Sequence, residues 1–126
     1  MNRILIIDDD DAVLNVLKDE LVRAGYDVTE ARDGLEGLKS FVESSADLVI
    51  TDIFMPEKEG LELIQDLRAA SSSVRIIAMS GGSLAAPGFP TLTVADHLGA
   101  DYTIEKPFTL KGMLKLVCVA LRGVSE

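Results

Sequence analysis

The sequence predicts an α/β fold of three layers, in which a five-stranded parallel sheet is covered by helices on both faces. Short apolar runs alternate strictly with longer amphipathic segments along the 126 residues, and this alternation is typical of parallel sheets. The length suits one compact domain, which we assign to residues 1–126. Apolar residues form 48% of the chain, which is enough to fill a single core.

The period of the apolar residues predicts each element in turn. The apolar runs predict strands at 4–7, 26–31, 48–51, 74–79 and 102–104. The amphipathic segments predict helices at 12–24, 35–42, 61–67 and 110–121, with a short fourth helix that ends near Leu98. In the first helix, one buried face is formed at spacings of three and four by Val13, Leu14, Leu17 and Leu21. Gly25 stands where a glycine ends a helix, and Asp33 with Gly34 marks the turn into the second helix.

The stretch at 81–93, GGSLAAPGFPTLT, interrupts this regular pattern. Pro87 and Pro90, together with neighbouring glycines and serines, prevent a regular helix there. A loop of this length between a strand and its helix is either mobile or functional, unless it is a tolerated surface insertion. Both interpretations stay open at this point.

The charge of the chain excludes one class of partner. With 12 Lys or Arg against 21 Asp or Glu, the formal net charge is −9 and the pI is near 4.5. A nucleic-acid-binding domain normally carries a basic stripe, so we expect no direct contact with nucleic acid. No apolar stretch approaches the roughly 20 residues that span a bilayer, so we expect a cytoplasmic protein without a membrane partner.

Polar residues are concentrated at the carboxyl ends of the predicted strands, where an open parallel sheet binds its ligands. The first strand is followed by Asp8 and Asp9, and the third ends in Asp52. The fourth strand ends in Ser80, and the fifth leads into Lys106. In the flavodoxin-like strand order 2-1-3-4-5, the first strand lies beside the third. This order would bring the three aspartates together.

Three carboxylates in one crevice repel each other by roughly 4 kcal/mol per close pair, at an effective dielectric constant of about 20. They therefore need a cation, and hard oxygen ligands suit Mg²⁺, or Mn²⁺ in its place. Asp52 stands alone at the end of a central strand, which favours it as a nucleophile toward phosphorus, whereas Asp8 and Asp9 suit metal binding. Lys106 would add a fixed positive charge, and Ser80 a small hydrogen-bond donor. We interpret Asp10 and Asp11 as residues that start the first helix.

Four segments carry a resemblance to a known family. They are RILIIDDDDAVL at 3–14, DLVITDIFMPEKEGLEL at 47–63, RIIAMSGG at 75–82 and GADYTIEKPF at 99–108. Together they make the chain resemble the receiver domain of two-component response regulators, of which the chemotaxis response regulator is the best known. The similarity extends over about residues 2–121.

The resemblance implies a phosphorylation site and its metal. Asp52 would accept a phosphoryl group from a phosphohistidine on a sensor histidine kinase or a histidine phosphotransfer protein. Mg²⁺ would be bound by Asp9, Asp52 and the backbone carbonyl of Phe54, with Asp8 acting through water. Lys106 would contact a phosphoryl oxygen.

The resemblance also assigns switch and structural residues. Ser80 would move to hydrogen-bond the phosphoryl group once it arrives. Pro56 and Gly60 resemble the family's loop-shaping pair, and the bond between Lys106 and Pro107 resembles its cis peptide. The domain would act only on its own aspartate, by phosphotransfer and autodephosphorylation, and would not be an enzyme with a separate substrate.

Two departures from the family concern the switch. Three positions before Lys106 the family usually has an aromatic residue, and here that position is Thr103. The aromatic Tyr102 stands one residue earlier and, in a strand, faces the opposite side. The second departure is the longer loop at 81–93. Our hypothesis is that phosphorylation reorders this loop and the short fourth helix instead of rotating an aromatic ring.

The last predicted helix is unusually apolar, and its apolar face could bind a partner protein. One face carries Leu110, Leu114, Val117 and Leu121. In one interpretation, this face forms a surface with the fourth helix and the fifth strand that binds a second copy of the chain or a downstream protein target. In the other, the helix is simply packed more deeply than average. The sequence does not identify the target, nor whether the domain acts alone or belongs to a longer regulator.

Three other functions fit the sequence less well. A haloacid-dehalogenase-like phosphatase places an acid two residues after its nucleophile, and here that residue is Phe54. A pseudo-receiver that only docks to proteins would not need all the site residues present. A flavodoxin needs a Ser/Thr/Gly-rich loop after the first strand, where this chain has four consecutive aspartates.

Overall fold

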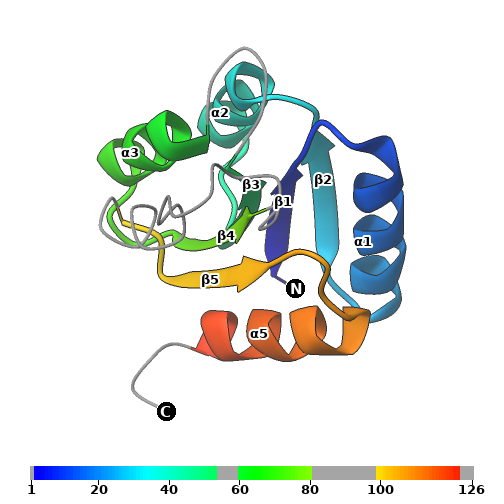
Figure 1. The fold of residues 1–126 in the computed structure, drawn as a ribbon. Coiled ribbons are helices and arrows are strands. Elements are labelled where there is room, and N and C mark those ends of the chain that lie inside the picture. Colours follow the sequence, from blue (N-terminus) through cyan, green and yellow to red (C-terminus); the bar gives the residue numbers. More distant parts are fainter. Residues whose placement is uncertain (1, 54–59, 81–98, 123–126) are drawn as a thin grey trace.

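The computed structural model describes residues 2–53, 60–80 and 99–122 (Figure 1). Its elements are β1 (Arg3–Ile7), α1 (Asp11–Arg23), β2 (Asp27–Ala31), α2 (Gly34–Glu43), β3 (Leu48–Asp52), α3 (Gly60–Ala70), β4 (Arg75–Ser80), β5 (Tyr102–Glu105) and α5 (Leu110–Arg122). Each corresponds to an element predicted from the sequence. The predicted fourth helix, the loop at 81–93, Phe54 and Pro56 lie outside the described residues.

The five strands form one parallel sheet in the order β2-β1-β3-β4-β5, which confirms the predicted fold. β1 and β3 are central and neighbours, with Ile7 opposite Thr51. Their side chains are buried almost throughout, because helices cover both faces. The acids that follow these two strands therefore emerge side by side.

The helices form two outer layers, with α1 and α5 on one face of the sheet and α2 and α3 on the other (Figure 1). Successive side chains of a strand point to opposite faces, so β1 contributes to both cores. Ile4 and Ile6 pack with α1 and α5, whereas Leu5 and Ile7 pack toward α2 and α3. Among the described residues, no helix is long and apolar enough to cross a membrane.

The ends of α1 are defined by its flanking residues, as the sequence predicts. Asp10 is the N-cap, and its side chain accepts a hydrogen bond from the Ala12 amide at 2.9 Å. At the other end Gly25 has φ of 102°, a value that favours glycine. The amides of Gly25 and Tyr26 donate to the carbonyls of Val22 and Leu21, which closes the helix in a Schellman motif.

The apolar helix α5 is packed more deeply than a surface helix with a single buried stripe. Met113, Val117 and Ala120 are buried. Further residues of the helix are partly buried against the same core, namely Leu110, Leu114, Leu116 and Leu121. Much of its apolar surface therefore serves the core, and its use as a dimer or target surface stays a prediction.

Candidate functional site

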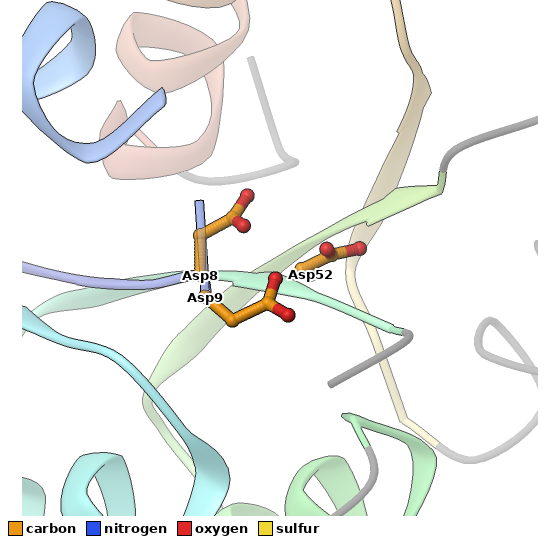
Figure 2. A group of neighbouring side chains, drawn as sticks. All are labelled: Asp8, Asp9 and Asp52. Carbon is orange, nitrogen blue, oxygen red and sulfur yellow. The ribbon is translucent and has the colours of Figure 1, made fainter. Parts of the chain in front are cut away.

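Three carboxylates meet at the carboxyl ends of β1 and β3. Asp52 is the last residue of β3, and Asp8 and Asp9 directly follow β1. Because Ile7 pairs with Thr51, Asp8 and Asp52 stand at the same level of the sheet. Asp8, Asp9 and Asp52 each offer one ligand atom, and these atoms all lie within 4.8 Å of one another (Figure 2).

The three acids differ in their exposure to solvent. Asp8 is fully buried and Asp52 is 6% exposed, whereas Asp9 is exposed. The buried Asp8 is held in place by its own loop, because the Asp10 amide donates to its Oδ1 at 2.9 Å. The cluster therefore has two buried acids at its base and one side that is open to solvent.

Lys106 supplies the positive charge nearest to these acids among the described residues. Its Nζ donates to Asp8 Oδ2 at 2.8 Å and to Asp52 Oδ2 at 3.4 Å. The side chain is 22% exposed. It comes from the residue after β5 and reaches past the end of β4 to the two central strands. The peptide bond between Lys106 and Pro107 is cis.

Burial and charge act on these groups in opposite directions. Burial raises the pKa of Asp8 above its ordinary 3.8, and the hydrogen bond from Lys106 offsets only part of this rise. For Lys106, burial lowers the pKa, but the hydrogen bond to Asp8 and the charge of Asp52 outweigh burial, so the pKa is raised. One ammonium offsets only one of three carboxylate charges. The donor set, three hard oxygens with residual negative charge, can hold a metal ion.

The predicted switch residues lie on β4, which is the neighbour of β3, and on the edge strand β5. Ser80 ends β4, in register with Glu105 of β5. Tyr102 packs against the core beneath α1 and α5, which places the next residue, Thr103, on the opposite face of β5. The Tyr102 hydroxyl is buried and has no hydrogen-bond partner within the described part of the chain. Gly60 is the first residue of α3.

The family follows from a match over most of the chain. A model of the response regulator receiver domain matches residues 4–118. The chain belongs to the response regulator receiver family. This receiver domain also has the sheet order and the strand-end acids that the sequence predicts for that family.

Individual curated proteins are similar to nearly the whole chain. The transcriptional regulatory protein YrkP of Bacillus subtilis is 38% identical over 122 residues, which cover 95% of this chain and 49% of YrkP. The response regulator MprA of Mycobacterium sp. is 33% identical over 98% of this chain and 52% of MprA. The receiver domain thus spans about half the length of these curated relatives.

Solved structures agree with the fold. A CheY-like receiver domain protein from Methanospirillum hungatei is 30% identical, with a TM-score of 0.89 over 97% of this chain and 94% of that one. The chemotaxis protein CheY4 of Vibrio cholerae is 27% identical, with a TM-score of 0.86 over 96% of this chain and 99% of that one.

Sequence reasoning missed one contact in this receiver site. It treated Asp10 only as a helix-start residue, but the Asp10 amide also holds the carboxylate of Asp8. The signal is present in the sequence, because an aspartate two residues before a helix cap commonly accepts a hydrogen bond from that residue's amide. Asp10 therefore both begins α1 and orients the buried acid.

Proposed function

We propose that this receiver domain accepts a phosphoryl group on Asp52 from a sensor histidine kinase or a histidine phosphotransfer protein. The observation that carries the proposal is the position of Lys106 Nζ, which contacts both the buried Asp8 and Asp52 beside a third acid, Asp9. A nucleophilic carboxylate next to a fixed cation and a metal-binding cluster suits phosphoryl transfer, in which positioning and charge neutralisation do most of the catalysis.

In the proposed reaction, an oxygen of Asp52 attacks the phosphorus of the phosphohistidine in line with the leaving imidazole. A P–O bond forms as the P–N bond breaks, and the imidazole nitrogen keeps the bonding electron pair. Lys106 stabilises the charge on the phosphoryl oxygens. Lys106 contacts Asp52, and Asp52 is the residue that becomes phosphorylated. After the transfer, the ammonium group of Lys106 therefore faces a phosphoryl group where it faced a carboxylate.

Asp8, Asp9 and Asp52 are the residues that would hold Mg²⁺ or Mn²⁺. When bound, such an ion supplies two positive charges and open positions for phosphoryl oxygens. The exposed Asp9 lies on the open side of the cluster, and the buried Asp8 would act from the base. The contribution of the Phe54 carbonyl stays a prediction from the family.

The downstream step is a change of protein contacts, not a direct action on nucleic acid. The relatives named transcriptional regulators are about twice as long as this chain, so their output need not come from the receiver part. The roles of Ser80 and Thr103 in the switch, and a homodimer through the fourth helix, β5 and α5, belong to the same proposal. A cytoplasmic location is expected from the family.

Intact-mass measurement after incubation with acetyl phosphate and Mg²⁺ tests the proposal. The wild-type protein should gain the mass of one phosphoryl group, and Asp52→Asn should gain none. Asp27→Asn is the matched control, because Asp27 is an exposed strand carboxylate far from the cluster, and it should be modified like the wild type. Modification of Asp52→Asn, or of no protein at all, would contradict the assignment.

A further inference from the structure

Arg68, in the last turn of α3, joins three parts of the chain at the end of the sheet opposite the acids. Its Nη1 donates to the carbonyls of Ser72 at 3.1 Å and Val74 at 2.7 Å. Its Nη2 donates to the carbonyl of Gly99 at 2.7 Å and to Asp101 Oδ2 at 2.9 Å. The planar guanidinium can reach all four acceptors at once, which a single ammonium group cannot do.

Asp101 completes this arrangement from the other side. Its Oδ2, which accepts from Arg68, also accepts from the Ile76 amide at 2.8 Å. The Asp101 amide donates to the Ile76 carbonyl at 2.9 Å. The ion pair is partly buried, with 26% and 23% of the two side chains exposed. The residue just before β5 is therefore attached to the start of β4 by both its backbone and its side chain.

β5 depends strongly on such an attachment. It is four residues long and lies at the edge of the sheet, so its ladder is short and has one neighbour, β4. The observed register pairs Ile77 with Tyr102 and Ser80 with Glu105, which leaves Lys106 just beyond the end of the ladder. A slip of one residue reverses the faces of a strand. Here it would move Glu105 toward the place of Lys106 and set a fourth carboxylate beside the acids.

The acids themselves are held by a different part of the sheet. Asp8, Asp9 and Asp52 follow the central strands β1 and β3, which pair directly with each other. Arg68 and Asp101 contact β4 and the residues before β5. The contacts of Arg68 and Asp101 therefore bear on the strand that leads to the lysine and not on the strands that carry the acids.

We propose that Arg68, acting through Asp101, is a positioning residue that sets the register of β5 and so places Lys106 against Asp8 and Asp52. The proposal rests on the proposed function for its kinetic consequence and on the geometry alone for its structural one. Arg68 touches none of the reacting groups, so its removal should slow transfer without weakening metal binding.

The test begins with Arg68→Met, which keeps a long apolar side chain and removes all four hydrogen bonds. We expect its rate of phosphorylation by acetyl phosphate with saturating Mg²⁺ to fall, by up to about 100-fold if Lys106 is displaced by about 1 Å. Mg²⁺ affinity, measured by titration without phosphodonor, should be at least that of the wild type, because the three carboxylates stay and a competing ammonium moves away. Arg68→Lys should lie between the two, because it keeps the charge but not the fork of donors.

A double-mutant cycle separates positioning from general loss of stability. In a Lys106→Met background, Arg68→Met should cause no further loss of rate, because the group that it positions is already absent. Ile64→Val is the stability control, because it removes one buried methylene group from the same helix and leaves all four hydrogen bonds of Arg68 in place. All variants are compared well below their unfolding temperatures. A rate for Arg68→Met equal to the wild type, or an equal loss in both backgrounds, would overturn the proposal.

A measurement without phosphodonor keeps this inference distinct from the proposed function. The ammonium resonance of Lys106, identified by its absence in Lys106→Met, should shift in Arg68→Met and stay in place in Ile64→Val. An unchanged resonance would overturn the positioning role. If the wild-type protein takes up no phosphate but the resonance moves, the proposed function fails and the positioning role stands.

Discussion

The ammonium of Lys106 donates a hydrogen bond of 2.8 Å to Asp8 Oδ2, although 98 positions separate the two residues in the chain. The same nitrogen lies 3.4 Å from Asp52 Oδ2. The contact joins the residue after the last strand to the residue after the first. Because Asp8 is fully buried, the loss of either partner changes both the stability of the fold and the charge of the site.

Lys106→Met should slow phosphorylation strongly. The substitution keeps the aliphatic stem and removes the fixed charge near the transferring group, and the loss of such a group lowers rates by about 100-fold or more. The rate of mass gain with acetyl phosphate and Mg²⁺ measures the effect. Lys111→Met, at an exposed lysine of α5, is the control and should leave the rate unchanged. A Lys106→Met rate close to that of the wild type would remove the lysine from the mechanism.

Asp8→Asn should stabilise the protein in the absence of metal. Burial raises the pKa of Asp8 in the folded state, so at neutral pH the ionised carboxylate is less favourable in the folded chain than in the unfolded one. We expect the free energy of unfolding to rise, because the substitution removes a charge that burial and the neighbouring Asp9 disfavour. Urea unfolding in EDTA at neutral pH measures the change, and a loss of stability would contradict it.

The advantage of Asp8→Asn should depend on pH in a defined direction. In the wild type, the folded state binds the Asp8 proton more tightly than the unfolded state, whose pKa is near the ordinary 3.8. As the pH falls from neutral through the raised pKa toward 3.8, Asp8 of the folded wild type takes up this proton. The free energy of unfolding of the wild type then rises toward that of Asp8→Asn. The difference between the two proteins should therefore shrink. A difference that grows on acidification would show that another group controls it.

Mg²⁺ should stabilise the folded domain through the acidic cluster. At a free concentration ten times the dissociation constant, binding to the folded state alone adds about 1.4 kcal/mol to the free energy of unfolding. Asp9→Asn should remove most of this gain, because it takes away the exposed ligand of the cluster. Asp27→Asn should keep it. Equal stabilisation of Asp9→Asn and the wild type would place the metal elsewhere.

Gly37→Ala should destabilise the domain despite the preference of helices for alanine. A Cβ at Gly37 would lie 2.5 Å from Ile7 Cδ1 and 2.9 Å from its Cγ1. Overpacking of this kind costs about 1–3 kcal/mol, against a gain in helix propensity of about 1 kcal/mol. We therefore expect a lower unfolding midpoint, measured with urea.

The Ile7→Val background tests the cause of that loss. It removes Cδ1, the atom that would lie nearest to the new methyl group. Gly37→Ala should then cost less than it does in the wild type, a coupling that a double-mutant cycle detects. Equal costs in both backgrounds would mean that the contact with Ile7 is not responsible.

The local elements and their order could be predicted from the sequence. The strand predicted at 4–7 is observed as β1 (Arg3–Ile7), and the glycine expected after the first helix, Gly25, has the positive φ that ends α1. These features depend on the period of apolar side chains and on the conformations of single residues, which a sequence carries in full. Once the strand order 2-1-3-4-5 is assumed, the sequence also predicts that the three aspartates at the strand ends lie together.

The sequence by itself determined which residues stand at the carboxyl ends of the strands, because a strand and the residues that follow it can be identified from the local sequence alone. Only the tertiary structure decided that Asp8 is fully buried while Asp9 is exposed. It alone brought Arg68 to Gly99 and Asp101, more than thirty positions away. The physical reason is that burial and long-range hydrogen bonds depend on neighbours that folding supplies from distant segments, and the local pattern of residues does not encode them.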